Sequence, residues 1–198
     1  MDPLSLGVVL LTATALLGSP GPGIAALVTV GRAEGFIRGL RYYAGLQVGL
    51  AVAAAVSAGG MISVLRAFPA AMMTMTWVAT AYLVYLACQI ATAPVGAALA
   101  GRRRTSSSAI AGLLLGTANP KALVAFASLF ASRSVAVDPQ ADILLKWALC
   151  VAVMLIVDLA WLFVGVAMNQ ASLRPAPERA LNLCLAAMIL GSAGLAFL

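Results

Sequence analysis

The sequence predicts an all-α integral membrane protein with six transmembrane helices, and two observations carry this prediction. Of the 198 residues, 63% are hydrophobic and only 9% are charged, whereas a soluble domain carries about a quarter charged residues. The few charges also leave uncharged runs close to or above the roughly 20 residues that a helix needs to cross a bilayer. Helices satisfy their backbone groups internally over such runs.

The positions of the charges set the bounds of the expected helices. The six spans cover residues 4–30, 42–65, 69–94, 109–132, 146–168 and 180–198. Because the connecting loops are short, nothing is expected to fold outside the membrane. We therefore expect a single membrane domain, 1–198, that comprises one repeat over about 1–93, a basic cytoplasmic linker over about 94–108 and a second repeat over about 109–198.

Basic residues set the expected orientation, because cytoplasmic loops carry an excess of Lys and Arg. The loops after the first, third and fifth spans contain eight basic residues: Arg32, Arg38, Arg41, Arg102, Arg103, Arg104, Arg174 and Arg179. The other side contains three: Arg66, Arg133 and Lys146. We therefore expect the odd-numbered loops in the cytoplasm and both termini outside.

The composition also excludes several kinds of chemistry. The chain has no histidine, which removes Ser-His-Asp and Cys-His catalysis and histidine-bound metals. The three cysteines lie inside apolar runs without a CxxC pair, as is typical of small hydrophobic residues. The net charge of +6 fits basic cytoplasmic loops. We expect no catalytic residue, no metal, no cofactor and no nucleic-acid partner.

Two of the six helices are expected to break. The first contains Gly18-Ser19-Pro20-Gly21-Pro22-Gly23, and the fourth contains Gly116-Thr117-Ala118-Asn119-Pro120-Lys121. Proline removes a backbone donor, and glycine adds backbone freedom. The backbone groups freed at membrane depth must be buried or line a cavity. The alternative is that the first helix simply ends at Ser19 and a short segment follows.

The two breaks resemble each other at an offset of 98 residues, at which Gly18 matches Gly116 and Pro22 matches Pro120. A repeat unit of three helices reverses the second copy relative to the first. Paired broken helices in an inverted repeat point to the binding site of a transporter. We therefore predict two inverted three-helix repeats whose breaks approach each other and line one cavity.

Two ionisable residues lie near the middle of predicted spans, Lys121 in the fourth and Asp158 in the fifth. Each costs roughly 2.5–3.5 kcal/mol on insertion scales, and such residues are functional by default. They form either a structural ion pair or a site for substrate and proton. Gln47, Tyr82 and Trp161 either face the same cavity or serve in helix packing. The pairs Gly45 and Gly49, and Gly112 and Gly116, allow close helix contact and with it a homodimer.

At these residues the chain resembles the LysE/RhtB family of amino-acid exporters. The matching features are Pro20-Gly21-Pro22, the glycine-studded region from Gly31 to Gly49, and Asn119-Pro120-Lys121, together with the size, the six spans and the basic middle loop. The resemblance implies a secondary exporter in a bacterial cytoplasmic membrane, driven by a proton gradient or the membrane potential. The family motif commonly reads Pro-Gly-Pro-Asn, whereas Gly23 stands at its fourth position here.

The chemistry of the candidate residues fits an amino acid or related small zwitterion. Lys121 and backbone N–H groups freed at a break suit a carboxylate. Asp158, or carbonyls freed around Pro20–Gly23, suit an ammonium group. The predicted substrate-binding residues are Pro20, Gly21, Pro22, Gly23, Asn119, Pro120, Lys121 and Asp158, with Gln47, Tyr82 and Trp161 as further candidates.

Three other classes of protein are alternatives to the exporter. A metal or other cation exporter of related build would have to use one intramembrane carboxylate without histidine, which makes a poor metal site. A hydrolase within the membrane would need a second carboxylate or a base beside Asp158. A membrane scaffold that does not transport leaves the two central charges and the two proline breaks without a purpose.

Overall fold

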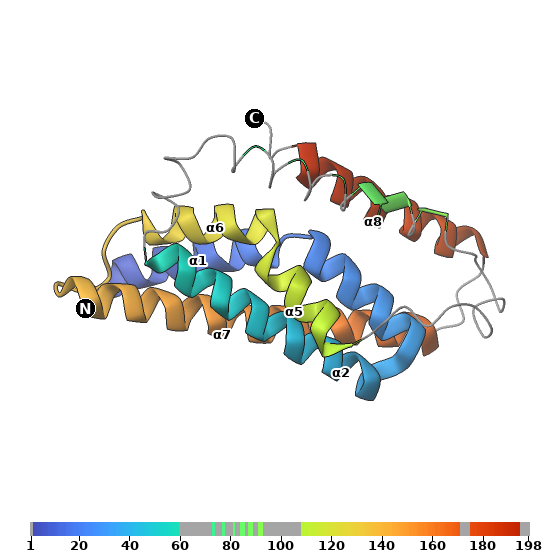
Figure 1. The fold of residues 1–198 in the computed structure, drawn as a ribbon, viewed down its shortest axis with the longest axis horizontal. Helices are drawn as coiled ribbons and strands as arrows, with labels where there is room; N and C mark the ends of the chain where they lie inside the picture. Colours follow the sequence, from blue (N-terminus) through green and yellow to red (C-terminus); the bar gives the residue numbers. More distant parts are fainter. Residues whose placement is uncertain are drawn as a thin grey trace.

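The computed structural model describes residues 2–59, 108–170 and 175–194, together with single positions between Met73 and Thr92. All regular structure within these parts is helical, as the sequence predicts (Figure 1). The expected linker and its three arginines lie outside the described residues, as do Tyr82, Arg66, Arg174, most of the span expected at 69–94 and the ends of the spans expected at 42–65 and 180–198.

The first helix breaks where the sequence predicts it. Helix α1 runs over Pro3–Gly18, and α2 begins at Pro22, bent by 58° from α1. Asp2 caps α1 by accepting hydrogen bonds of 3.2 Å from the N–H groups of Leu4 and Ser5. Pro22 is at the start of α2, where its missing N–H costs no helical hydrogen bond. Of the alternative, the end at Ser19 is confirmed, because Ser19 is the C-cap of α1. The segment that follows is not short, because α2 has 37 residues.

The loop expected between the first two spans is instead helical. Helix α2 extends over Pro22–Ala58 and is kinked at Gly35, whose φ of 77° and ψ of −178° are non-helical. Glycine adopts a positive φ without steric cost, so the chain turns here without leaving the helix for more than one residue. Arg38 and Arg41, which suggested a loop, are exposed on the helix surface.

The second break also lies at its expected place. Helix α5 covers Ala109–Thr117 and α6 covers Pro120–Phe130, with an angle of 51° between them. The Asn119 side chain accepts a 3.3 Å hydrogen bond from the N–H of Ala122, so it caps α6. A cap of this kind stabilises a helix by about 1 kcal/mol. Proline at the first position and asparagine before it therefore fix where α6 begins.

The fifth helix begins earlier than expected, because a buried ion pair satisfies the charges that suggested a loop. Helix α7 covers Pro139–Gln170 rather than 146–168. Lys146 is 1% exposed and pairs with Asp142 at 3.0 Å. Lys146 also donates to the carbonyl oxygens of Phe130 at 3.3 Å and Ser132 at 3.1 Å. Asp142 accepts from the N–H groups of Val135 and Ala136, so the pair holds the connection between α6 and α7.

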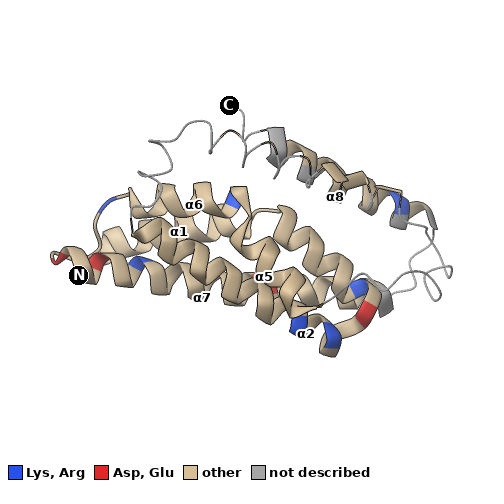
Figure 2. Ribbon diagram, in the orientation of Figure 1, with Lys and Arg blue, Asp and Glu red and all other residues tan. Residues whose placement is uncertain are grey.

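The described helices differ in whether they are long and apolar enough to cross a membrane. By length and composition, only Pro139–Met168 of α7 passes as a single span among the described residues, and each bent pair, α1 with α2 and α5 with α6, passes when taken together. Helix α8, Pro175–Gly194, begins before the expected residue 180, and residues 195–198 of the expected span lie outside the described residues. Figure 2 shows the charges gathered toward the two ends of the long helices, with a largely uncharged middle.

Helix α2 lies at the centre and packs against α7 and α5 through glycines. A Cβ added to Gly45 would lie 1.8 Å from the carbonyl oxygen of Ala109, and one added to Gly112 would lie 2.2 Å from that of Tyr42. The two glycine pairs thus bring α2 and α5 of one chain into backbone contact. Because these glycines pack against each other within one chain, their surfaces are not available for contact between two chains. The homodimer stays a prediction without this support.

Candidate functional site

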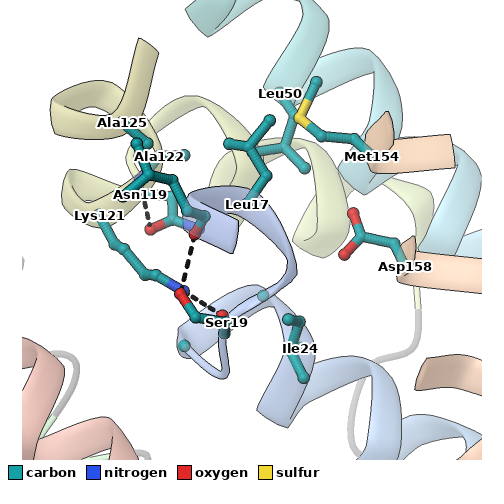
Figure 3. Close-up of a pocket in the computed structure, with 13 residues that line it drawn as sticks. Leu17, Ser19, Ile24, Leu50, Asn119, Lys121, Ala122, Ala125, Met154 and Asp158 are labelled. Atoms are coloured by element: carbon teal, nitrogen blue, oxygen red, sulfur yellow. Dashed lines mark hydrogen bonds between the residues drawn. The ribbon is translucent and has the colours of Figure 1, made fainter. Parts of the chain in front are cut away.

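A small cavity with a mixed polar and apolar lining lies between the two helix breaks (Figure 3). It has a volume of about 30 Å³, which is room for a water molecule. Its lining comes from the end of α1, the first break, α2, α6 and α7: Leu16, Leu17, Ser19, Gly21, Gly23, Ile24, Leu50, Asn119, Lys121, Ala122, Ala125, Met154 and Asp158.

Lys121 reaches from one break to the other. It is the second residue of α6, and its Nζ donates to the carbonyl oxygen of Ser19 and, at 3.3 Å, to that of Pro20. The last carbonyls of a helix have no partner within the helix and carry a partial negative charge. The ammonium group of Lys121 therefore satisfies the backbone that the break after α1 frees.

The two breaks approach closely at two points. A Cβ added to Gly21 would lie 2.7 Å from Cδ of Lys121, so the stem of this lysine runs across the bare backbone of Gly21. At the second point, a Cβ added to Gly23 would lie 3.5 Å from Nδ2 of Asn119. A side chain at position 21 would displace Lys121, whereas one at position 23 would meet Asn119 at ordinary contact distance.

Asp158 faces the same cavity from α7, across from Lys121 (Figure 3). It is 5% exposed, and one carboxylate oxygen accepts a 2.7 Å hydrogen bond from Nε2 of Gln47 on α2. Within the described part of the chain, Oε1 of Gln47 is buried without a partner. Lys121 and Asp158 do not form the direct ion pair that one interpretation of the sequence expected, since Lys121 binds backbone carbonyls instead.

The remaining predicted residues have four different outcomes. Pro20, Pro22 and Pro120 shape the breaks but do not line the cavity, and Gln47 reaches the site through Asp158. Trp161 does not line the cavity either, because it packs against the cluster of Ile24, Ala25, Val28, Ala87 and Ala186. Tyr82 lies outside the described residues.

The apolar lining was missed by reasoning from the sequence. Leu50 and Met154 are buried and close the cavity between α2 and α7, while Ala122 and Ala125 line it from α6. Met154 precedes Asp158 by one helical turn, a spacing that places two residues on one face. That spacing was the available signal, but in a span where nearly every residue is apolar it does not stand out.

Broken helices beside a cavity that contains ionisable side chains are typical of secondary membrane transporters, whose sites use backbone freed at helix breaks. This arrangement places the protein in the class of helical membrane transport proteins. Comparison with known families agrees, because the model of the LysE type translocator family matches residues 14–198. The chain belongs to the LysE type translocator family.

Curated relatives match a shorter part of the chain. Proteins named cysteine/O-acetylserine efflux protein from Salmonella choleraesuis (strain SC-B67), Salmonella paratyphi A and Salmonella typhi are each 34% identical to it over 76 residues. The match covers 38% of this chain and 39% of each relative. No solved structure matches the chain.

Proposed function

We propose that the protein is a secondary exporter of amino acids or related small zwitterionic metabolites across a bacterial cytoplasmic membrane. One observation carries the proposal: a lysine and a buried carboxylate face one cavity from opposite sides, beside two helix breaks. A zwitterion presents a carboxylate and an ammonium group to these two charges. The relatives named as efflux proteins for cysteine and O-acetylserine support small amino acids as the substrate class.

The two charges have different roles in this proposal. Lys121 binds the substrate carboxylate, helped by the positive end of α6, which begins at Pro120. Asp158 either binds the coupling proton or pairs with the substrate ammonium, because its carboxylate is buried and accepts a hydrogen bond from only one side chain. A proton gradient or the membrane potential then drives export.

We further propose that the chain consists of two inverted repeats. The contacts at the cavity support this, because an offset of 98 residues converts Gly21 into Asn119 and Gly23 into Lys121. The same offset therefore exchanges the contact of Gly21 with Lys121 for that of Asn119 with Gly23. A pair of contacts that exchange in this way is expected from a two-fold relationship. Rocking of one repeat against the other would open the small cavity to alternate sides.

Counterflow into proteoliposomes tests this function. Vesicles containing the purified chain and a high internal concentration of unlabelled amino acid are given labelled amino acids, including cysteine and O-acetylserine. We expect accumulation of the label for at least one amino acid and none in vesicles without protein. No counterflow with any amino acid would favour a cation exporter or a scaffold. The described residues contain no group of three potential metal-binding side chains, so no observation favours metal export.

A further inference from the structure

The carbonyl oxygens of Ser19 and Pro20 accept hydrogen bonds from the ammonium group of Lys121. Ser19 has extended backbone angles, φ −71° and ψ 140°, so its carbonyl is outside the hydrogen bonding of α1. Its hydroxyl is already used, since it donates to the carbonyl oxygen of Leu16 at 2.9 Å. Within the described residues, Lys121 is the group that donates to both freed carbonyls. Ser19 lines the cavity, and the carbonyl of Pro20 accepts from the same ammonium group. The two oxygens are thus a binding site for an ammonium group that the protein fills with its own side chain.

The substrate of the proposed exporter carries the same chemical group. A primary ammonium has three N–H donors wherever it occurs, so the ammonium of an amino acid and that of Lys121 fit the same carbonyls. The stem of Lys121 has four flexible carbons and passes over Gly21, which has no side chain to hold it in place. The lysine can therefore withdraw from the carbonyls without a change in α6.

Exchange of the two ammonium groups leaves every charge partnered. While Lys121 stays on the carbonyls, its donors are engaged and it gains little from a carboxylate. Once a substrate ammonium replaces it, Lys121 is released toward the substrate carboxylate, which lies a short distance from that ammonium. A buried ammonium without a partner is strongly unfavourable, and the exchange avoids such a state both with and without substrate.

We propose that the carbonyl oxygens of Ser19 and Pro20 form a site for primary ammonium groups, which Lys121 occupies in the empty protein and the substrate ammonium occupies in the loaded one. This inference rests on the proposed function and assigns the substrate ammonium to these carbonyls. Lys121 then competes with the substrate ammonium for the carbonyls and binds the substrate carboxylate once it is displaced. Primary amines without a carboxylate must displace Lys121 without compensation, so they bind the unaltered protein weakly.

Lys121→Ala tests the site by vacating it. The substitution removes three carbons and one nitrogen, which are the heavy atoms of n-propylammonium. Thermal unfolding of the purified full chain is measured with n-propylammonium, with tetramethylammonium, which has no N–H donor, and with propan-1-ol, which has no charge. We expect n-propylammonium alone to raise the Tm of Lys121→Ala, by about 2–4 °C at saturating concentration. Equal responses to all three compounds, or no response, would overturn the proposal.

Lys121→Met is the matched control, because it keeps an unbranched stem over Gly21 and removes the ammonium. With the stem in place there is no room for the added amine, so its Tm should not respond to n-propylammonium. The unaltered protein should not respond either, because Lys121 occupies the site. A response of Lys121→Met as large as that of Lys121→Ala would place amine binding elsewhere and contradict the assignment.

A measurement on the unaltered protein covers the case in which Lys121→Ala does not fold. The N-trimethyl derivative of an exported amino acid keeps the positive charge and the carboxylate but has no N–H donor. It should inhibit counterflow at least about tenfold more weakly than the amino acid itself. Inhibition within about twofold would contradict the carbonyl site. Absence of counterflow with every amino acid would instead contradict the proposed function, and the n-propylammonium response would still decide whether the site exists.

Discussion

Gln47 donates a 2.7 Å hydrogen bond to Asp158 and so joins α2 to α7 beside the cavity. Both residues are buried, at 8% and 5% exposed. Hydrogen bonds to charged groups contribute more to stability than those between neutral groups, and loss of the donor leaves a buried carboxylate with one partner fewer. The position of Asp158, and with it the polar wall of the cavity, depends on this amide.

Gln47→Leu should therefore destabilise the protein, by about 1–3 kcal/mol. Addition of Asp158→Asn should recover part of this loss, because it removes the charge that has lost its donor. The matched control is Gln140→Leu on the exposed start of α7, which should stay within about 0.5 kcal/mol of the unaltered protein. Thermal unfolding of the four purified proteins measures these effects. Equal stability of Gln47→Leu and Gln140→Leu would show that the hydrogen bond contributes nothing.

Gly112→Ala should separate α2 from α5, since the added Cβ would lie 2.2 Å from the carbonyl oxygen of Tyr42. Overpacking of this kind costs typically 1–3 kcal/mol. Gly7→Ala is the control, because nothing lies within 4 Å of a Cβ there. Alanine in place of an unhindered helical glycine stabilises by about 0.4–1 kcal/mol. The two substitutions should thus shift the Tm in opposite directions, and a shift in the same direction would contradict the close packing.

The double substitution Pro22→Ala with Pro120→Ala should impair export more than folding. Each proline disfavours helical angles in the residue before it, and alanine lifts this restriction. The helices can then continue across the breaks, which withdraws the freed backbone from the cavity. Counterflow rate and Tm are compared with those of the unaltered protein. A counterflow rate equal to that of the unaltered protein would reject the role of the breaks.

Topology provides a prediction that is independent of the site. If the basic residues decide orientation, a reporter fused after Arg104 should report the cytoplasm and one fused after Leu198 should report the outside. A compartment-sensitive enzyme pair, such as alkaline phosphatase and a cytoplasmic reporter, makes the measurement. A cytoplasmic C-terminus would contradict either the six-span count or the orientation.

The sequence predicted the helical class and both breaks because these depend on local chemistry. Long uncharged runs in a membrane form helices, because helices satisfy their own backbone groups. Adjacent prolines and glycines interrupt a helix whatever its tertiary environment. The approach of the breaks was predicted from their resemblance at an offset of 98 residues, although the individual contacts of Lys121 were not.

The features that the sequence did not predict depend on which groups meet in space. Lys146 suggested a helix boundary, but Asp142 one turn earlier and the carbonyls at the end of α6 satisfy its charge inside the protein. Lys121 and Asp158 suggested an ion pair, but each has another partner from a distant part of the sequence. The sequence named these carbonyls and Gln47 as candidates for the same site, but it carries no signal for which charge each of them contacts.

The double variant Lys121→Met with Asp158→Asn tests the central claim most directly. A variant that neutralises only one of the two residues leaves the other charge buried in the cavity. The double variant keeps the approximate shape of both side chains and leaves neither charge. The account predicts a protein that folds and elutes like the unaltered chain but shows no counterflow of any amino acid. Counterflow at the unaltered rate by the folded double variant would contradict the claim that these two residues carry transport.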